Sequence, residues 1–320
     1  MNLLEVKALQ VHLSQGGGLF RSSPHRIHAV EDVSFSVAPN ETVGLVGESG
    51  CGKTTLGRAV IKLIEPTAGS VWFEGQNIVP LKGKTLRSLR RRFQMIFQDP
   101  YSSLNPRMTV QEIIGEALDI HRLTPTPDQR SNRVQALLES VGLDAAHASR
   151  YPNEVSGGQR QRIGIARALA VEPKFIVCDE PVSALDVSVQ AQVVNLLRDL
   201  QREKGIAYLF VAHDLAVVEH ISHRILVMYL GRIVESGPSR SVTGSPAHPY
   251  TQALISAVPV VDPDSKRKRI LLPGDAPSPL HPPTGCPFHP RCPIAQKQCQ
   301  TERPMLREIR PAHHVACHLA

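Results

Sequence analysis

The chain has 320 residues, 42% of them hydrophobic, which favours one large or two modest globular domains. No apolar run approaches the roughly 18 residues that a membrane span requires, and Met1–His12 lacks the layout of a signal peptide. We therefore expect a cytosolic chain that reaches a membrane only through a partner. The net charge is +7, but the basic residues are scattered and only 4% of residues are aromatic, so we expect no nucleic-acid partner.

The first two-thirds of the chain alternates short β-rich runs with helix-like stretches. This alternation predicts an α/β fold with a largely parallel sheet flanked by helices. The expected buried strands are Thr42–Val46, Phe93–Phe97, Phe175–Cys178 and Tyr208–Val211. The expected helices are Lys53–Ile64, Val110–Ile120, Gly157–Ala170 and Ser188–Glu203.

A glycine-rich motif, Gly47–Thr54, lies between the first of these strands and the first helix. It fits G-x-x-x-x-G-K-[ST], the pattern of a loop that curls backbone N–H groups around phosphates at a helix N-terminus. Lys53 is expected to neutralise the β and γ phosphates of a nucleotide, and Thr54 to offer a hydroxyl to Mg²⁺. The residues expected to contact ATP are Gly47, Ser49, Gly50, Cys51, Gly52, Lys53, Thr54 and Thr55.

Two acidic residues, Asp179 and Glu180, follow the apolar strand Phe175–Cys178. A carboxylate at the end of a strand can hold Mg²⁺ or its waters, which suits Asp179. An adjacent carboxylate can orient and deprotonate an attacking water, which suits Glu180. Two acids after a strand more often form a solvated loop, and it is the phosphate-binding motif upstream that favours the catalytic interpretation.

Further motifs complete a pattern that resembles the ATP-binding-cassette family. Val155–Gln159, spelled Val-Ser-Gly-Gly-Gln, resembles the signature sequence of that family, with Val where Leu or Phe is commoner. Gln98 matches the Q-loop glutamine, Ser183–Asp186 matches the D-loop, and His213 matches the switch histidine. Six motifs in the family order within one chain are very unlike a chance match.

The resemblance implies a P-loop NTPase fold of the ABC nucleotide-binding type over residues 1–238. Such a domain has a RecA-like core, an antiparallel β subdomain and an α-helical subdomain, the last expected at about residues 99–165. Many relatives stack an aromatic ring on adenine, and the corresponding position here is Leu13. Adenine is therefore expected to meet an apolar contact or a residue of the Gly16–Phe20 loop.

The resemblance also implies a head-to-tail dimer, because one chain cannot easily fold its own signature onto its own phosphate-binding loop. The expected catalytic residues are Glu180, His213 and Gln98, with His213 at the γ-phosphate. The expected Mg²⁺ ligands are Thr54, Gln98 and Asp179. The further residues expected to contact nucleotide, including ATP held by the partner, are Ser156, Gly157, Gly158, Gln159 and Asp186.

After Pro238 the composition changes, which predicts a separate, Cys-bearing extension over residues 239–320. More than half of the prolines lie there, so we expect mostly irregular structure with one short helix at Pro249–Ala257. Its four cysteines are Cys286, Cys292, Cys299 and Cys317. Their wide spacing suits an iron–sulfur cluster better than zinc, which usually takes closer pairs, and disulfides are disfavoured in a cytosolic chain. Zinc and free thiols remain the alternatives.

Four strings narrow the resemblance to the importers of dipeptides and oligopeptides. They are Gln98–Arg107, His248–Leu254, Pro273–Pro279 and Gly285–Pro293. The third resembles most the second, F-type, of the two ATPases that such importers pair. The resemblance implies a 4Fe-4S cluster in the tail and a place at the cytoplasmic face of the bacterial inner membrane. It also implies a paralogous ATPase, two transmembrane permease subunits and an extracytoplasmic peptide-binding protein as partners.

Other functions fit the sequence less well. The cargo could be nickel or glutathione within the same subfamily, because the ATPase itself does not touch it. A nucleic-acid-acting ATPase would carry a long coiled coil or a second cassette, and only Thr55–Glu154 separates the two phosphate motifs. Exporters are commonly fused to membrane helices. A non-catalytic cassette typically lacks Glu180 or His213, and both are present.

Overall fold

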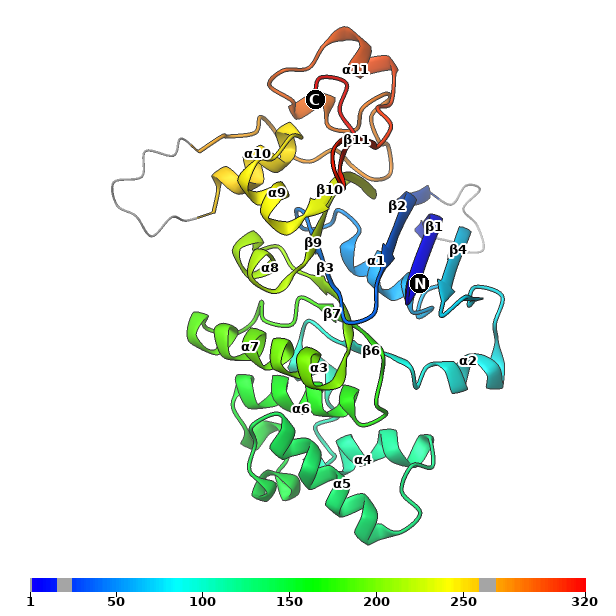
Figure 1. Cartoon of the computed structure of the whole chain (residues 1–320), viewed down its shortest axis with the longest axis vertical. Coiled ribbons are helices and arrows are strands. Elements are labelled where there is room, and N and C mark those ends of the chain that lie inside the picture. The colour runs from blue at the N-terminus through cyan, green and yellow to red at the C-terminus, as the bar shows by residue number, and fades with distance from the viewer. Residues whose placement is uncertain (1, 16–24, 259–268) are drawn as a thin grey trace. The chain divides into compact units, whose positions relative to one another are not determined.

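Contacts within the chain define two compact units in the computed structural model, which describes residues 2–15, 25–258 and 269–320 (Figure 1). The first unit consists of Met1–Ala38, Thr42–Val79 and Phe210–Ala320, and the second of Pro39–Glu41 and Pro80–Leu209. The C-terminal segment therefore shares a unit with the N-terminal strands and with Gly47–Thr54. Among the helices described, none is both long enough and apolar enough to cross a membrane.

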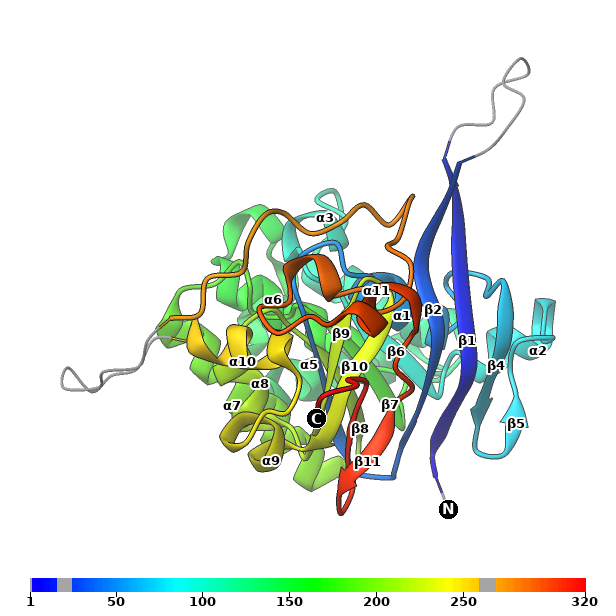
Figure 2. The same ribbon diagram turned by 90° about the horizontal axis from the view of Figure 1, so that it is seen from above.

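An antiparallel sheet in the first unit has the strand order β2-β1-β4-β5 (Figure 2). These strands are β1 (Leu4–Gln15), β2 (His25–Val37), β4 (Ala68–Phe73) and β5 (Gln76–Asn77). The side chains of β1 alternate between a buried and an exposed face until Ala8, whose φ of 47° accompanies a shift of register. The bulge lets Leu9 and Val11 continue the buried row that Leu4 and Val6 begin.

A second set of strands in this unit has the order β11-β12-β10-β9-β3. They are β3 (Thr42–Val46), β9 (Arg224–Tyr229), β10 (Arg232–Pro238), β11 (Arg307–Arg310) and β12 (His313–Val315). β3 and β9 run parallel, while β9, β10, β12 and β11 are antiparallel neighbours. All five residues of β3 are buried, as expected of a parallel strand covered on both faces.

The helices of the first unit are short. They are α1 (Lys53–Val60), α8 (Leu215–Ile221), α9 (Ser239–Gly244), α10 (Pro249–Ser256) and α11 (Lys297–Thr301), with a 3-10 turn at His289–Arg291. The fully buried carboxylate of Glu235 joins the tail to β10. It accepts hydrogen bonds from the backbone of Ala247 (2.8 Å) and His248 (2.9 Å), and His313 lies 2.7 Å away.

The second unit pairs β6 (Phe93–Ile96) with β7 (Phe175–Asp179) in parallel, and it also contains the first three residues of β8 (Ala207–Val211). The helices of this unit are α2 (Gly83–Leu89), α3 (Pro100–Ser103), α4 (Val110–Ile120), α5 (Pro127–Ser140), α6 (Gly157–Leu169) and α7 (Val187–Lys204). It also has 3-10 turns at Ala145–Ser149 and Pro152–Glu154. Helices α4, α5 and α6 pack against one another (Figure 1).

The structure contains every strand and helix expected from the sequence, with ends that differ by a few residues. The largest difference is at α1, which ends at Val60 rather than Ile64. There Lys62 adopts a left-handed conformation with φ of 55°, and the amide of Leu63 bonds back to the carbonyl of Arg58 at 2.8 Å, an arrangement that ends helices. The tail is mostly irregular as expected, but it also supplies β11 and β12.

Candidate functional site

A tight turn joins β3 to α1 in the first unit. Gly47 and Gly52 have φ values of 155° and 107°. A Cβ at Gly47 would lie 2.2 Å from the carbonyl oxygen of Met228, and one at Gly52 would lie 2.0 Å from that of Ala29. Both positions therefore exclude a side chain. At Gly50, by contrast, no described heavy atom beyond its chain neighbours lies within 4 Å of the Cβ position, so the turn is open there.

Lys53 begins α1 and is only 4% exposed. Its ammonium donates hydrogen bonds to the carbonyl oxygens of Gly47 (2.7 Å) and Glu48 (3.0 Å), so the cation lies across the turn. No side chain caps α1, and the positive end of the helix dipole adds to the charge of Lys53. Burial raises the pKa of the neighbouring Cys51 thiol, although Lys53 acts to lower it. The turn therefore offers a fixed positive charge without a competing thiolate, which suits a phosphate.

Gln98 and Glu180 lie together in the second unit, 82 residues apart in sequence. They follow the parallel neighbours β6 and β7, whose carboxyl ends share one edge of the sheet. Gln98 Nε2 donates a hydrogen bond of 2.8 Å to Glu180 Oε2. Glu180 has a φ of 44°, a left-handed conformation that costs a residue with a side chain about 1–3 kcal/mol. Asp179, the last residue of β7, is 1% exposed.

The predicted Ser-Gly-Gly sequence opens α6. Ser156 Oγ accepts a hydrogen bond from the amide of Gln159 (3.3 Å), and Gln159 Oε1 accepts one from the amide of Ser156 (2.9 Å). These reciprocal bonds form a capping box. A Cβ at Gly158 would lie 2.6 Å from Val189 Cγ1, so this glycine lets α6 pack closely on the first turn of α7.

Asp186, in the predicted D-loop, caps α7. Its Oδ1 accepts hydrogen bonds from Ser188 Oγ (2.7 Å) and from the amide of Val189 (3.0 Å), and these bonds hold the pKa of Asp186 below its usual value. The same loop is tied to the predicted base, because the amide and hydroxyl of Ser183 donate to the carbonyl oxygen of Glu180 at 3.3 and 3.1 Å.

His213 belongs to the first unit, where it follows β8 and is exposed. The preceding residue, Ala212, donates its amide to the carbonyl oxygen of Leu45 at 3.1 Å, and Leu45 lies in the strand that carries the glycine-rich turn. The following residue, Asp214, caps α8 by accepting from the amide of Ala216 at 2.9 Å. His213 is therefore held between a strand end and a helix start.

The chain is similar to known proteins. Residues 30–183 match the family described as ABC transporter, and residues 234–299 match the oligopeptide/dipeptide transporter C-terminal region. The putative oligopeptide transport ATP-binding protein YkfD of Bacillus subtilis is 56% identical over 319 residues, which cover 99% of this chain and 95% of YkfD. The chain belongs to the ABC transporter family. AppF, an oligopeptide transport ATP-binding protein of the same species, is 51% identical over 320 residues, or 99% and 97% of the two chains.

Solved ABC proteins share the fold. The ATP-binding cassette MJ0796, in a dimeric post-hydrolysis state with ADP and Pi, superposes with a TM-score of 0.66 at 28% identity over 74% of this chain and 99% of that one. CbiO1 of Clostridium perfringens superposes with a TM-score of 0.65 at 25% sequence identity. The superposition covers 76% of this chain and 91% of CbiO1. The P-loop ABC ATPase fold expected from the sequence is thus confirmed, and this ABC protein is an ATPase coupled to transport.

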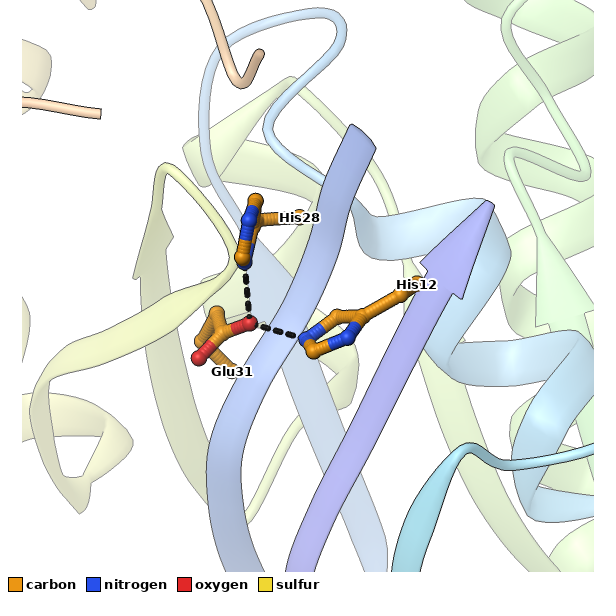
Figure 3. A group of neighbouring side chains, drawn as sticks. All are labelled: His12, His28 and Glu31. Carbon is orange, nitrogen blue, oxygen red and sulfur yellow. Dashed lines mark hydrogen bonds and ion pairs between the residues drawn. The ribbon is translucent and has the colours of Figure 1, made fainter. Parts of the chain in front are cut away.

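The predicted adenine contact Leu13 lies half-buried in β1, while the Gly16–Phe20 loop lies outside the described residues. Beside Leu13, the side chains of His12 and His28 point at one oxygen of Glu31 (Figure 3). His28 Nδ1 lies 2.7 Å from it, and Arg232 donates to the other oxygen at 3.3 Å. Burial acts to raise the pKa of Glu31, but the hydrogen bonds from the two histidines outweigh it and lower that pKa.

The ring nitrogens of His12 and His28 and the Glu31 oxygen lie within 4.8 Å of one another, close enough for a shared metal ion. In the described ranges of the chain, no other three His, Cys, Asp or Glu side chains meet this criterion. Because Arg232 already neutralises Glu31, we interpret the group as a hydrogen-bonded link between β1 and β2.

In the tail, two of the four cysteines lie side by side. Cys286 and Cys299 are buried, and the amide of Cys286 donates to the carbonyl oxygen of Cys299 at 2.8 Å. Burial raises the pKa of Cys286 to about 11, although a hydrogen bond from the backbone of Phe288 acts to lower it.

Three further residues contact the glycine-rich turn or belong to it, and none of them is among the site residues expected from the sequence: Glu48, Tyr250 and Arg291. Glu48 lies within the glycine-rich turn, where its hydrogen bonds involve both tail residues. The strings around Tyr250 and Arg291 did carry the subfamily resemblance, and that was their only signal. Sequence alone gives no way to place either beside a residue more than 200 positions earlier.

Proposed function

We propose that this chain is the ATP-hydrolysing subunit of an importer of dipeptides or oligopeptides. The observation that carries the proposal is the presence, in one chain, of a turn built around buried Lys53 and of the oligopeptide/dipeptide transporter C-terminal region. The names of YkfD and AppF describe oligopeptide transport, which favours a peptide cargo over nickel or glutathione.

ATP would lie with its phosphates on the Gly47–Thr54 turn, with Lys53 neutralising the β and γ phosphates. Mg²⁺ prefers oxygen ligands, and the Thr54 hydroxyl, the Gln98 amide and the Asp179 carboxylate would supply them. The amide nitrogen of Gln98 is engaged by Glu180, which leaves its oxygen as the atom to face the metal. The ion would supply further charge neutralisation at the phosphates.

Glu180 would act as the general base. Its carboxylate accepts a proton from water as the water oxygen bonds to the γ-phosphorus, and the bond from that phosphorus to the β,γ-bridging oxygen breaks to leave ADP and phosphate. Gln98 holds the carboxylate through the 2.8 Å hydrogen bond, and His213 would contact the γ-phosphate. The left-handed backbone at Glu180 costs stability, and such strain is commonly found at residues with a catalytic or binding role.

The signature residues Ser156–Gln159, together with Asp186, would contact ATP held by a paralogous ATPase. Two permease subunits would receive the resulting motion, and an extracytoplasmic binding protein would deliver the peptide. The chain would then lie at the cytoplasmic face of the bacterial inner membrane. We assign residues 1–238 to the ATPase domain, with its helical subdomain at about 99–165, and residues 239–320 to the extension. The C-terminal family match begins near that boundary, at residue 234.

The four tail thiols would hold a 4Fe-4S cluster that fastens the extension. One tetrahedral zinc ion holds its thiolates about 3.8 Å apart, and no three of these four sulfur atoms all lie within 4.8 Å of one another. A four-iron cluster spaces its cysteines more widely. Protein purified without oxygen is expected to contain about four irons and four sulfides per chain. Zinc without iron or sulfide would contradict the cluster.

Replacing Glu180 by Gln tests the catalytic assignment. The variant keeps the hydrogen-bonding shape but loses the base, so the ATPase kcat of the assembled transporter should fall at least about 100-fold while ATP binding persists. Glu203→Gln, at an exposed position in α7, is the matched control and should hydrolyse ATP like the wild type. Full ATPase activity in Glu180→Gln would sink the assignment.

Transport in proteoliposomes tests the cargo. With its permeases, paralogous ATPase and binding protein, the wild-type chain should drive uptake of a labelled dipeptide or oligopeptide, and Glu180→Gln should not. Uptake of nickel or glutathione in place of peptide would refute the proposed cargo and leave the ATPase assignment intact.

A further inference from the structure

All three polar groups of Glu48 are engaged within the first unit. Its amide donates to the hydroxyl of Tyr250 at 2.8 Å, its carbonyl oxygen accepts from Lys53 Nζ at 3.0 Å, and its carboxylate accepts from the Arg291 guanidinium at 2.8 Å. Tyr250 and Arg291 follow Glu48 by 202 and 243 residues. The phosphate-binding turn is thus held by its own lysine on one side and by the C-terminal segment on the other.

Tyr250 is rigidly placed. It is 0% exposed, and its ring packs against Tyr229 and Phe288 with centroids 4.7 and 5.5 Å away, while Tyr229 and Phe288 meet edge to face at 5.2 Å. Its amide bonds to Nδ1 of His248, which caps α10. The hydroxyl can leave Glu48 only if this aromatic cluster repacks, so the bond fixes the backbone of the turn at one point.

Arg291 is placed by the cysteine-bearing segment. It ends the 3-10 turn His289–Arg291, its amide bonds to the carbonyl oxygen of Phe288 at 3.0 Å, and the next residue is Cys292. The side chains of Arg291 and Glu48 are 10% and 31% exposed, so their ion pair is partly shielded from solvent. Such a pair keeps more of its strength than a fully exposed one.

The charge of Glu48 matters because the turn is built for an anion. A carboxylate without a cationic partner would repel a triphosphate arriving on the same turn, and it would also be free to compete for Lys53. Arg291 removes both effects by pairing with the carboxylate. The Tyr250 hydroxyl acts at the backbone instead. It fixes the peptide between Gly47 and Glu48, whose Gly47 carbonyl oxygen accepts a hydrogen bond from Lys53 at 2.7 Å.

We propose that Tyr250 and Arg291 are positioning residues for nucleotide binding, and that through Glu48 they hold the Gly47–Thr54 turn in its phosphate-binding conformation. The C-terminal segment then serves the ATPase directly, besides any part it has in assembly. This inference rests on the proposed place of ATP on that turn.

Tyr250→Phe tests the backbone contact in the full-length chain. The variant keeps the ring and loses one neutral hydrogen bond, so Mg-ATP should bind about fivefold more weakly by calorimetry. Hydrogen exchange should also speed up at the Glu48 amide, which a general loss of stability would not single out. Tyr208→Phe is the matched control: this tyrosine is equally buried, lies in β8, and should leave the affinity within about twofold.

A double-mutant cycle tests the charge contact. Arg291→Gln leaves the Glu48 carboxylate unpaired, so the affinity for Mg-ATP should fall about tenfold or more. Adding Glu48→Gln removes that carboxylate and should restore most of the affinity, whereas a merely structural loss would persist in the double variant. Arg303→Gln, an exposed arginine of the same segment, should bind as the wild type does.

The outcomes separate the two proposals. If the wild-type chain does not bind Mg-ATP, the proposed function itself fails. If it binds, but Tyr250→Phe and Arg291→Gln bind equally well, only the positioning role is overturned. A double variant no better than Arg291→Gln would overturn the electrostatic part, and unchanged exchange at the Glu48 amide would overturn the backbone part.

Discussion

His248 is a titratable residue held in a place that disfavours its charge. It is 1% exposed, and burial lowers its pKa to about 3. Its Nδ1 accepts a hydrogen bond from the amide of Tyr250, so that nitrogen carries no proton. The ring therefore acts as a neutral cap at the N-terminus of α10. A lysine or arginine at position 248 has no side-chain acceptor and could not make this hydrogen bond.

Stability should consequently fall in acid. The unfolded histidine gains a proton below its usual pKa of about 6.5 while folded His248 stays neutral until about pH 3, so stability is lost as pH falls through that window. Between pH 7 and pH 5 the loss is about 2 kcal/mol. Urea unfolding at both pH values should show this loss in the wild type and not in His248→Asn, which keeps a capping side chain. His220→Asn, at an exposed position in α8, should keep the wild-type pH dependence; an equal slope in His248→Asn would exclude the effect.

Among single residues, the site residues that could be predicted from the sequence are those that belong to a short, recognisable motif. Gly47, Gly52 and Lys53 could be predicted because a turn at a helix start has few solutions, and the close approach of Met228 and Ala29 to the glycines agrees with that. Glu48 could not be predicted, since its neighbours in sequence say nothing about Tyr250 or Arg291.

At the scale of elements, periodic apolar runs were enough for the strand–turn–helix segments. β3, α4 and α10 begin where the sequence predicts because a buried run, the cap Thr109 and a proline at the first helical position mark them. β11 and β12 were missed because strands of four and three residues carry no periodicity. β12 pairs with β10 and β11 pairs with β12, and the first of these pairings depends on contacts distant in sequence, such as that between Glu235 and His313.

At the scale of the whole molecule, the C-terminal segment is part of the unit that holds the phosphate-binding turn. β12 pairs with β10, and the buried rings of Tyr250 and Phe288 cover Tyr229 at the end of β9. Burial of each such ring contributes about 1.5–3 kcal/mol, and Glu235 would lose its tail partners if the segment were absent.

A chain that ends at Pro238 should therefore fail to fold cooperatively. We expect it to be insoluble, or to melt well below the full-length chain in calorimetry, because aromatic surface and a buried carboxylate are exposed together. Removing only His318–Ala320, at the far end, should leave the melting temperature nearly unchanged. A soluble 1–238 chain with the full-length melting temperature would show that the extension is an independent appendage.

The contacts at Glu48 also restrict which nucleotide-binding segments and C-terminal segments of related ATPases can be combined in one chain. A chimera that joins the nucleotide-binding half of one ATPase to the tail of another exchanges Tyr250 and Arg291 but leaves Glu48 behind. Such a hybrid is compatible only when the donor tail presents a hydroxyl and a guanidinium at the same two places. Genetic exchange and protein engineering therefore have to treat positions 48, 250 and 291 as one inherited set.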